Sequence, residues 1–168
     1  MSINLMHRTL ADLSKPAGNI PTGLWNKIRG IKLTAKEVTK TNRDGEEFEA
    51  VEFTLSAEAV EPSSSVDPDA LAEIDAATGK PSYEGKRLFL RYSDAFRSDM
   101  TTMSAAMTAF GIPSDTSLQA IVDGNLVKGK VASGEIFNRD FKRNDGSDGV
   151  EQKVRSWAKV GTAHGFAL

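Results

Sequence analysis

The chain has 168 residues, of which 39% are hydrophobic and 26% charged, and its formal net charge is −2. This length and composition favour one domain with a full hydrophobic core and exclude a wholly disordered chain. The absence of cysteine excludes disulfides, thiolate metal sites and a cysteine nucleophile. No early apolar run has the form of a secretory leader, and none approaches membrane-spanning length, so we expect a cytoplasmic protein without a membrane partner.

The negative charge is concentrated in one segment of the chain. Residues 57–84 carry seven anions and one cation, which leaves the remainder with a net charge of +4. That charge is too small for a protein that wraps duplex DNA, but it is sufficient for a basic patch the size of a groove.

Residues 1–22 have no hydrophobic period and contain three Pro or Gly residues, so we expect an N-terminal arm there. A strand is predicted over 23–40, with a bulge or bend at Gly30. Residues 41–45 have strong turn chemistry, and apolar residues alternate again over 51–55, which together predict a β-hairpin.

Residues 57–84 interrupt this pattern with prolines and serines, and we interpret them as an insertion within the domain. A short helix is predicted from Asp67 or Pro68 to Ala77, because Asp67 can cap it and Pro68 suits its first position. The strand pattern resumes over 86–92, where arginines alternate with Leu and Phe.

The strongest helical pattern runs from Asp94 to Phe110, with Phe and Met at steps of three or four. We interpret this stripe as a core face that plugs a barrel, and a peptide-binding groove is the alternative. A second helix is predicted over 117–122 and a strand over 126–136. A polar turn is then expected over 138–149, followed by a last strand over 153–160.

Apolar and basic residues alternate with period two in the last strand. One face carries Val154, Ser156, Ala158 and Val160, and the other carries Lys153, Arg155, Trp157 and Lys159. Cations around a tryptophan are typical of a surface that stacks bases and neutralises phosphates. The alternative is that the cations only solvate this face while the tryptophan covers a neighbouring element.

Five short strands with a helix between the third and fourth predict a mainly β protein with the OB-fold, a five-stranded Greek-key barrel. The domain is expected over 23–160, with a short tail at 161–168. In this fold the ligand contacts one sheet face and the loops between strands 1–2 and 4–5, which here are residues 39–46 and 138–150.

Aromatic and basic residues fall on these loops and on the outward faces of the predicted strands. The candidate stacking residues are Trp25, Phe89, Phe141 and Trp157. The alternative for each of them is a place in the core, and it is strongest for Trp25 because its strand bends at Gly30. The candidate phosphate contacts are Lys27, Arg29, Lys40, Arg43, Arg87, Arg91, Arg139, Lys142, Arg143, Lys153, Arg155 and Lys159.

Three segments, Pro21-Thr22-Gly23-Leu24-Trp25, Phe53-Thr54-Leu55-Ser56 and Lys153-Val154-Arg155-Ser156-Trp157, carry a resemblance to a known family. Through them the chain resembles phage-type single-stranded DNA-binding proteins with an OB-fold, over roughly residues 20–160. The resemblance implies a non-catalytic protein that coats or protects single-stranded DNA in phage replication or recombination, in the host cytoplasm. Self-association and contacts with replication or recombination proteins are further expectations, and RNA stays open as a ligand. Many such proteins end in an acidic tail that recruits partners, whereas residues 161–168 contain no acidic residue.

Two other functions stay open at this stage. An OB-type protein-interaction or assembly module would use the acidic insertion or the methionine-bearing helix. An oligosaccharide-binding barrel is the third possibility, and the many cations do not favour it.

The sequence predicts neither an enzyme nor a bound cofactor or metal. Residues 124–130 have the spacing of a phosphate-binding loop, but Val131 replaces the required Ser or Thr and the expected strand-loop-helix context is missing. His7 and His164 lie near opposite ends of the chain, and no nucleophile with a suitable base is found.

Overall fold

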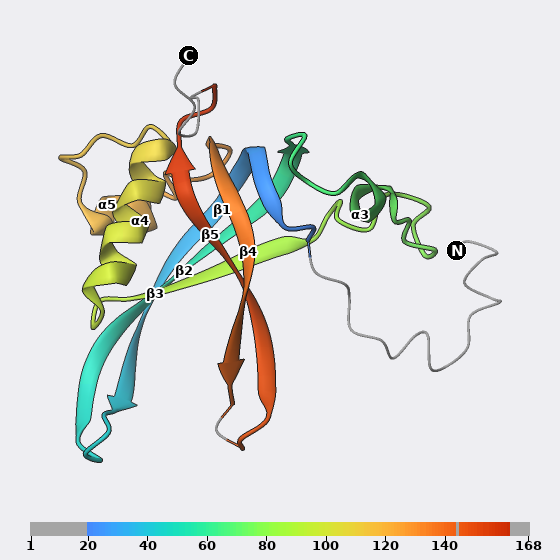
Figure 1. Ribbon diagram of the computed structural model, residues 1–168. Coiled ribbons are helices and arrows are strands. Elements are labelled where there is room, and N and C mark those ends of the chain that lie inside the picture. The colour runs from blue at the N-terminus through green and yellow to red at the C-terminus, as the bar shows by residue number, and fades with distance from the viewer. Residues whose placement is uncertain (1–19, 144, 162–168) are drawn as a thin grey trace.

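The alternating segments form one five-stranded antiparallel sheet in the computed structural model, which describes residues 20–143 and 145–161 (Figure 1). The strands are β1 (Gly23–Thr41), β2 (Glu47–Pro62), β3 (Arg87–Ser93), β4 (Val131–Lys142) and β5 (Asp148–Ala158). Their order is β3-β2-β1-β4-β5, so β3 and β5 are the edge strands. Within the described ranges no hydrogen-bonded pairing joins these two edges, and the sheet is not closed. The expected mainly β class is thus confirmed.

Three helices accompany the sheet in the described part of the chain. They are α3 (Pro68–Ala72), α4 (Arg97–Ala109) and α5 (Leu118–Asp123). The longest, α4, packs against β3, β4 and β5, and Gly111 with a φ of +84° follows its end. Among these helices there is none with the length and apolar character needed to cross a membrane.

The core lies between the inner face of the sheet and α4. In β2 every second residue from Phe53 to Ala59 is buried, and Leu88, Leu90 and Tyr92 of β3 point inward as predicted. Met103 and Met107 of α4 are buried against them, which confirms the core interpretation of this helix face. Each fully buried Leu or Met contributes about 1.5–3 kcal/mol to folding.

Gly30 allows β1 to bend, as predicted. The pairing of β1 with β2 shifts register between Gly30 and Lys32. A Cβ at Gly30 would lie 2.5 Å from the carbonyl oxygen of Val127, because the turn before β4 passes directly over it. The Gly30 N–H donates to the carbonyl of Lys130 at 2.7 Å, and the Gly129 N–H donates to Gly30 at 2.9 Å. A side chain here would therefore separate β1 from this turn.

The β1–β2 and β4–β5 hairpins extend beyond the rest of the sheet as two arms that project on the same side of the molecule (Figure 1). Asn42 ends the first arm, since its Oδ1 accepts the N–H groups of Asp44 and Glu46 at 3.0 and 2.9 Å. In the second arm the N–H of Arg143 donates to Ser147 across a turn that contains Gly146 with a φ of +85°.

Several expected boundaries were wrong, at strand ends and at helix ends. α4 begins at Arg97 and not at Asp94, and Phe96 of the expected core stripe is exposed before it. β2 continues to Pro62, because Ala57 and Ala59 stay buried against β1, so the insertion begins at residue 63 and not at 57. β4 begins at Val131 instead of 126, and it continues through residues 138–142. The expected polar turn over 138–149 is therefore mostly paired strand.

The segment 63–86 is anchored to the core more firmly than an inserted loop would be. Val66 is almost fully buried, and the ring of Tyr83 lies edge-on to Trp25 with centroids 5.2 Å apart. Leu24 of β1 donates its N–H to Ser65 Oγ and accepts the N–H of Ser63, both at 3.0 Å. The predicted cap and first turn of α3 are present, with Asp67 as the cap, but the helix ends at Ala72 and not at Ala77.

Candidate nucleic-acid interface

The outer face of β3 presents one phenylalanine between two arginines. Arg87, Phe89 and Arg91 all point to solvent, and the side chain of Phe89 is 59% exposed. The opposite β2 residues are Glu58, Ser56 and Thr54, so the ring stands on a polar surface. The alternation read from the sequence is correct for this strand.

β1 adds two further cations to the outer face that carries Phe89, and the sequence did not lead us to predict them. Lys32 lies opposite Ser56 and Lys36 opposite Glu52, and both lysines are exposed. The bulge after Gly30 moves the outward positions of β1 from odd to even numbers, so the alternation of Lys27 and Arg29 does not continue. Leu33 is an apolar residue between the polar residues Lys32 and Thr34, and this pattern was the signal in the sequence that could have revealed the shift.

Across the open edge of the sheet, β3 faces the β4–β5 hairpin. We call the space between β3 and the outer half of this hairpin the β3–β5 groove, and its volume is about 310 Å³. Its lining residues are Arg87, Leu88, Phe89, Arg91, Phe141, Val150, Glu151 and Gln152. Two candidate stacking residues, Phe89 and Phe141, thus share one groove although 52 positions separate them in the sequence.

The ring of Phe141 lies across β5 at Gly149. Glycine is required there, because a side chain at this position would occupy the place of the ring. A Cβ at Gly149 would lie 2.6 Å from Cζ of Phe141. The guanidinium carbon of Arg143 lies 5.5 Å from the centroid of the same ring. A cation and a 37%-exposed aromatic ring therefore meet on the second arm.

A second, smaller groove of about 140 Å³ lies nearer the helix, and we call it the α4 groove. Its lining residues are Leu90, Tyr92, Ser98, Asp99, Thr102, Phe137, Arg139, Lys153, Val154 and Arg155. Three of the predicted cations and two aromatic rings are brought together here. The two grooves follow one another along β3 and β5, and we refer to them together as the β3–β5 seam.

Arg155 has the most constrained side chain of these cations. It donates from Nε and Nη2 to the carboxylate of Glu135, directly opposite on β4, at 3.2 and 2.9 Å. Its guanidinium carbon lies 4.4 Å from the centroid of the Phe137 ring. The hydrogen bond from Arg155 lowers the pKa of Glu135, and the same bond raises the pKa of Arg155.

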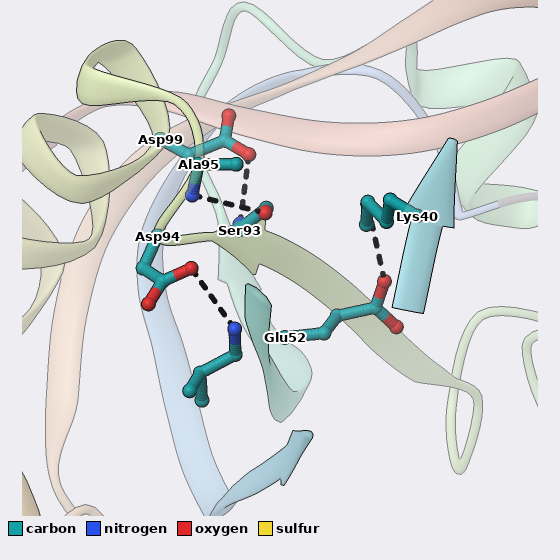
Figure 2. Close-up of polar contacts among 7 residues, drawn as sticks. Lys40, Glu52, Ser93, Asp94, Ala95 and Asp99 are labelled. Carbon is teal, nitrogen blue, oxygen red and sulfur yellow. Dashed lines mark hydrogen bonds and ion pairs between the residues drawn. The ribbon is translucent and has the colours of Figure 1, made fainter. Parts of the chain in front are cut away.

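Two carboxylates fix the junction between the C-terminal end of β3 and the start of α4. Asp94 Oδ1 accepts the N–H of Val51 at 2.9 Å, and Asp99 Oδ2 accepts the N–H of Ser93 at 2.9 Å (Figure 2). These bonds tie β2, β3 and the start of α4 together. Both carboxylates are thus used to hold backbone.

Several predicted phosphate contacts are held in cross-strand ion pairs at the surface. Lys40 lies 3.8 Å from Glu52 (Figure 2), and Arg139 lies 3.9 Å from Glu151. The other pairs are Arg29 with Glu58, and Lys142 with Asp148 at 3.3 Å. Exposed pairs of this kind are worth about 0–1 kcal/mol, so a phosphate could replace the carboxylates.

The remaining basic candidates lie outside the two grooves. Arg43 is exposed in the turn of the first arm, and Lys27 is half-buried on β1. Lys159 is exposed beyond the end of β5.

Trp25 is a core residue, and its assignment as a stacking residue is wrong. It is fully buried, and its Nε1–H donates to the carbonyl of Pro21 at 2.9 Å. A base cannot reach this ring.

The outward assignment of Trp157 is also wrong, because β5 contains a bulge. Ser133 pairs with Ala158 and Glu135 with Arg155, so β5 has one extra residue at this point, and Ser156 takes a φ of +57°. This turns Trp157 toward the core, where its ring lies 5.5 Å from that of Phe110.

Beside it lies the hydroxyl of Tyr92, which like Trp157 Nε1 is buried without a hydrogen bond of ordinary geometry. Burial raises the pKa of Tyr92 above its usual range, and the neighbouring Trp157 indole offsets part of this effect.

A third, more apolar groove of about 290 Å³ lies between α4 and α5. Met100, Met103, Met107, Ile112 and Ile121 contribute to its lining. It is the surface that a protein-interaction module would use. Across residues 20–143 and 145–161 no three His, Asp or Glu residues are grouped so that they could hold a metal ion.

No protein-family model matches the chain, and no curated protein is significantly similar to it. The functional inference therefore depends on the arrangement of the chain's own residues.

Proposed function

We propose that the protein binds single-stranded nucleic acid along the β3–β5 seam, with single-stranded DNA as the main ligand. The observation that carries this proposal is the exposed ring of Phe89, which lies between Arg87 and Arg91 and lines one groove with Phe141. An unpaired base can stack on such a ring with a gain of about 1–3 kcal/mol, while the flanking arginines contact its phosphates. Bases in a duplex are already stacked on each other, so a duplex would gain only the charge contacts.

We further propose that the sheet is an open OB-type barrel. Three features support this assignment: the strand order, the position of α4 between β3 and β4, and the adjacency of the edge strands β3 and β5 at the two grooves. OB-fold barrels are often partly open, and they bind oligonucleotides on the face of strands 2 and 3 and on the loops 1–2 and 4–5. The two projecting arms are the corresponding hairpins of this chain.

In this proposal the protein has no catalytic role. It coats or protects single strands during phage replication or recombination, and it acts in the host cytoplasm. A single domain with two short grooves contacts only a few nucleotides, so coverage of a long strand would need several copies side by side.

The direct test is fluorescence anisotropy with labelled oligothymidine, oligouridine and a DNA duplex of equal length. Intrinsic tryptophan fluorescence is a poor reporter, because Trp25 is buried and Trp157 packs on Phe110. We expect saturable binding of the single strands and much weaker binding of the duplex. Phe89→Ala should weaken single-strand binding by about 1–3 kcal/mol and leave its salt dependence unchanged.

Ile74→Ala is the control for exposed apolar surface, because Ile74 is 55% exposed and lies outside both grooves of the seam. Equal losses from the two variants would assign the effect to general surface hydrophobicity. A folded wild-type protein that binds none of the three ligands would instead favour the interaction module and its α4–α5 groove.

A further inference from the structure

One edge of the Arg155 guanidinium, formed by Nε and Nη2, is committed within the protein. These two nitrogens form a fork with both oxygens of Glu135, the direct cross-strand neighbour of Arg155. A phosphate at this position would have to displace a carboxylate that already matches the guanidinium in charge and geometry. That edge of Arg155 is therefore not available for the phosphate contact that its residue type suggests.

More than half of the same side chain is exposed to solvent. The ring of Phe137 lies under the guanidinium at 4.4 Å, and yet 58% of the Arg155 side chain is exposed. Phe137 covers one face and Glu135 occupies one edge, so the exposed surface includes the opposite face. Glu135 and Phe137 together keep this plane fixed, which lowers the entropy lost when a flat ligand stacks on it.

The neighbours of Arg155 supply the charge that a stacked nucleotide requires. Arg139 and Lys153 line the same α4 groove, one on each strand of the hairpin. Unpaired bases are known to stack on arginine planes as well as on aromatic rings. The groove thus combines one flat platform with two cations beside it.

We propose that Arg155 is a base-stacking platform, the middle layer of a stack formed by Phe137, Arg155 and one unpaired base. This inference rests on the proposed function and gives the α4 groove a specific ligand, a single nucleobase. Arg139 and Lys153 contact the phosphates on either side of that base.

The test compares two charge-conserving variants, Arg155→Lys and Arg139→Lys. Lysine keeps the positive charge but has no plane. We expect Arg155→Lys to weaken oligothymidine binding about 10-fold, the range of one stacked base, with no change in the salt slope. Arg139→Lys should change affinity less than about 2-fold, because a lysine can also contact a phosphate.

An abasic strand, which keeps every phosphate but has no bases, separates stacking from charge. Wild type and Arg155→Lys should bind it equally, because nothing remains to stack on the plane. A persistent defect of Arg155→Lys on the abasic strand would overturn the proposal and make Arg155 a phosphate contact. Equal losses in the two lysine variants, or wild-type affinity of Arg155→Lys for oligothymidine, would overturn it as well.

Two controls keep the outcome clear. Arg155 is exposed, so its lysine variant should fold, and thermal unfolding within about 3 °C of wild type checks this. If wild-type protein binds no single strand at all, the proposed function itself fails before any variant is compared. If wild type binds and the variants behave alike, only the stacking assignment fails.

Discussion

Burial separates the roles of the aromatic residues in this protein. Trp25 and Trp157 have the largest rings, yet both face the core, whereas the smaller ring of Phe89 stands between two arginines on the surface. A stacking platform requires an exposed ring face, so exposure and not ring size selects the candidates. A substitution of Trp157 should therefore change the stability of the fold and not the binding, although the sequence around Trp157 resembles a binding motif.

We expect Trp157→Ala to lower the free energy of unfolding by about 3 kcal/mol, because it removes a large ring from the contact with Phe110. Chemical denaturation measures this loss. Binding of oligothymidine by the fraction that remains folded should be nearly unchanged. A stable variant with about 1–3 kcal/mol weaker binding would restore Trp157 to the interface and contradict its inward orientation.

β3 and β5, in which basic and apolar residues alternate, show how much of the site could be predicted from the sequence. β3 has no bulge, so the outward positions of Arg87, Phe89 and Arg91 followed directly from period two. In β5 the period breaks at Ser156, which adopts a positive φ although it is not glycine. No local signal marks that residue, and one extra position was enough to turn Trp157 to the other face.

At the scale of elements, the segment between β2 and β3 has two parts with different roles. Val66, Leu71 and Tyr83 pack against the core, and Val66 is almost fully buried. Residues 74–81 are mainly exposed and form a small loop closed by the bridge between Ile74 and Pro81. Sequence composition could not separate these parts, because prolines and serines occur in both anchored and exposed loops.

We expect that replacement of residues 74–81 by two glycines leaves the domain folded, with a melting temperature within about 3 °C of wild type. The N–H of Ser82 already donates to the carbonyl of Glu73 at 2.8 Å, so a short turn can join the two ends. Val66→Ala should instead cost about 2 kcal/mol, because it leaves a cavity beside β1. A collapse of cooperative unfolding in the shortened protein would show that the exposed loop is part of the core.

The mainly β class, the succession of strands along the chain and the main helix were predictable because they depend on long hydrophobic periods. The strand ends were not, because the tips of both arms are paired through backbone groups while most of their side chains stay exposed. The grooves were not predictable either, since they form where β3 meets β5 across an edge that has no hydrogen-bonded pairing in the described residues. Only the three-dimensional arrangement brings Phe89 and Phe141 into one groove.

For the whole molecule, the open sheet leaves two neighbouring basic and aromatic grooves along its open edge, where β3 meets β5. α4 closes one end of the β3–β5 seam, and the β4–β5 arm forms one wall. The seam is the central feature of the account, because the stacking rings and the cations are collected there. Its use as the binding path can be measured without any substitution.

The most direct measurement is photo-crosslinking of oligothymidine to the wild-type protein, followed by identification of the crosslinked residues by mass spectrometry. We expect crosslinks on β3 at Phe89 and on β4 at Phe141, and their loss when unlabelled single strand competes. The duplex should neither crosslink nor compete at equal concentration. Crosslinks confined to the α4–α5 groove or to residues 63–86, with none on β3 or β4, would contradict the seam as the binding path.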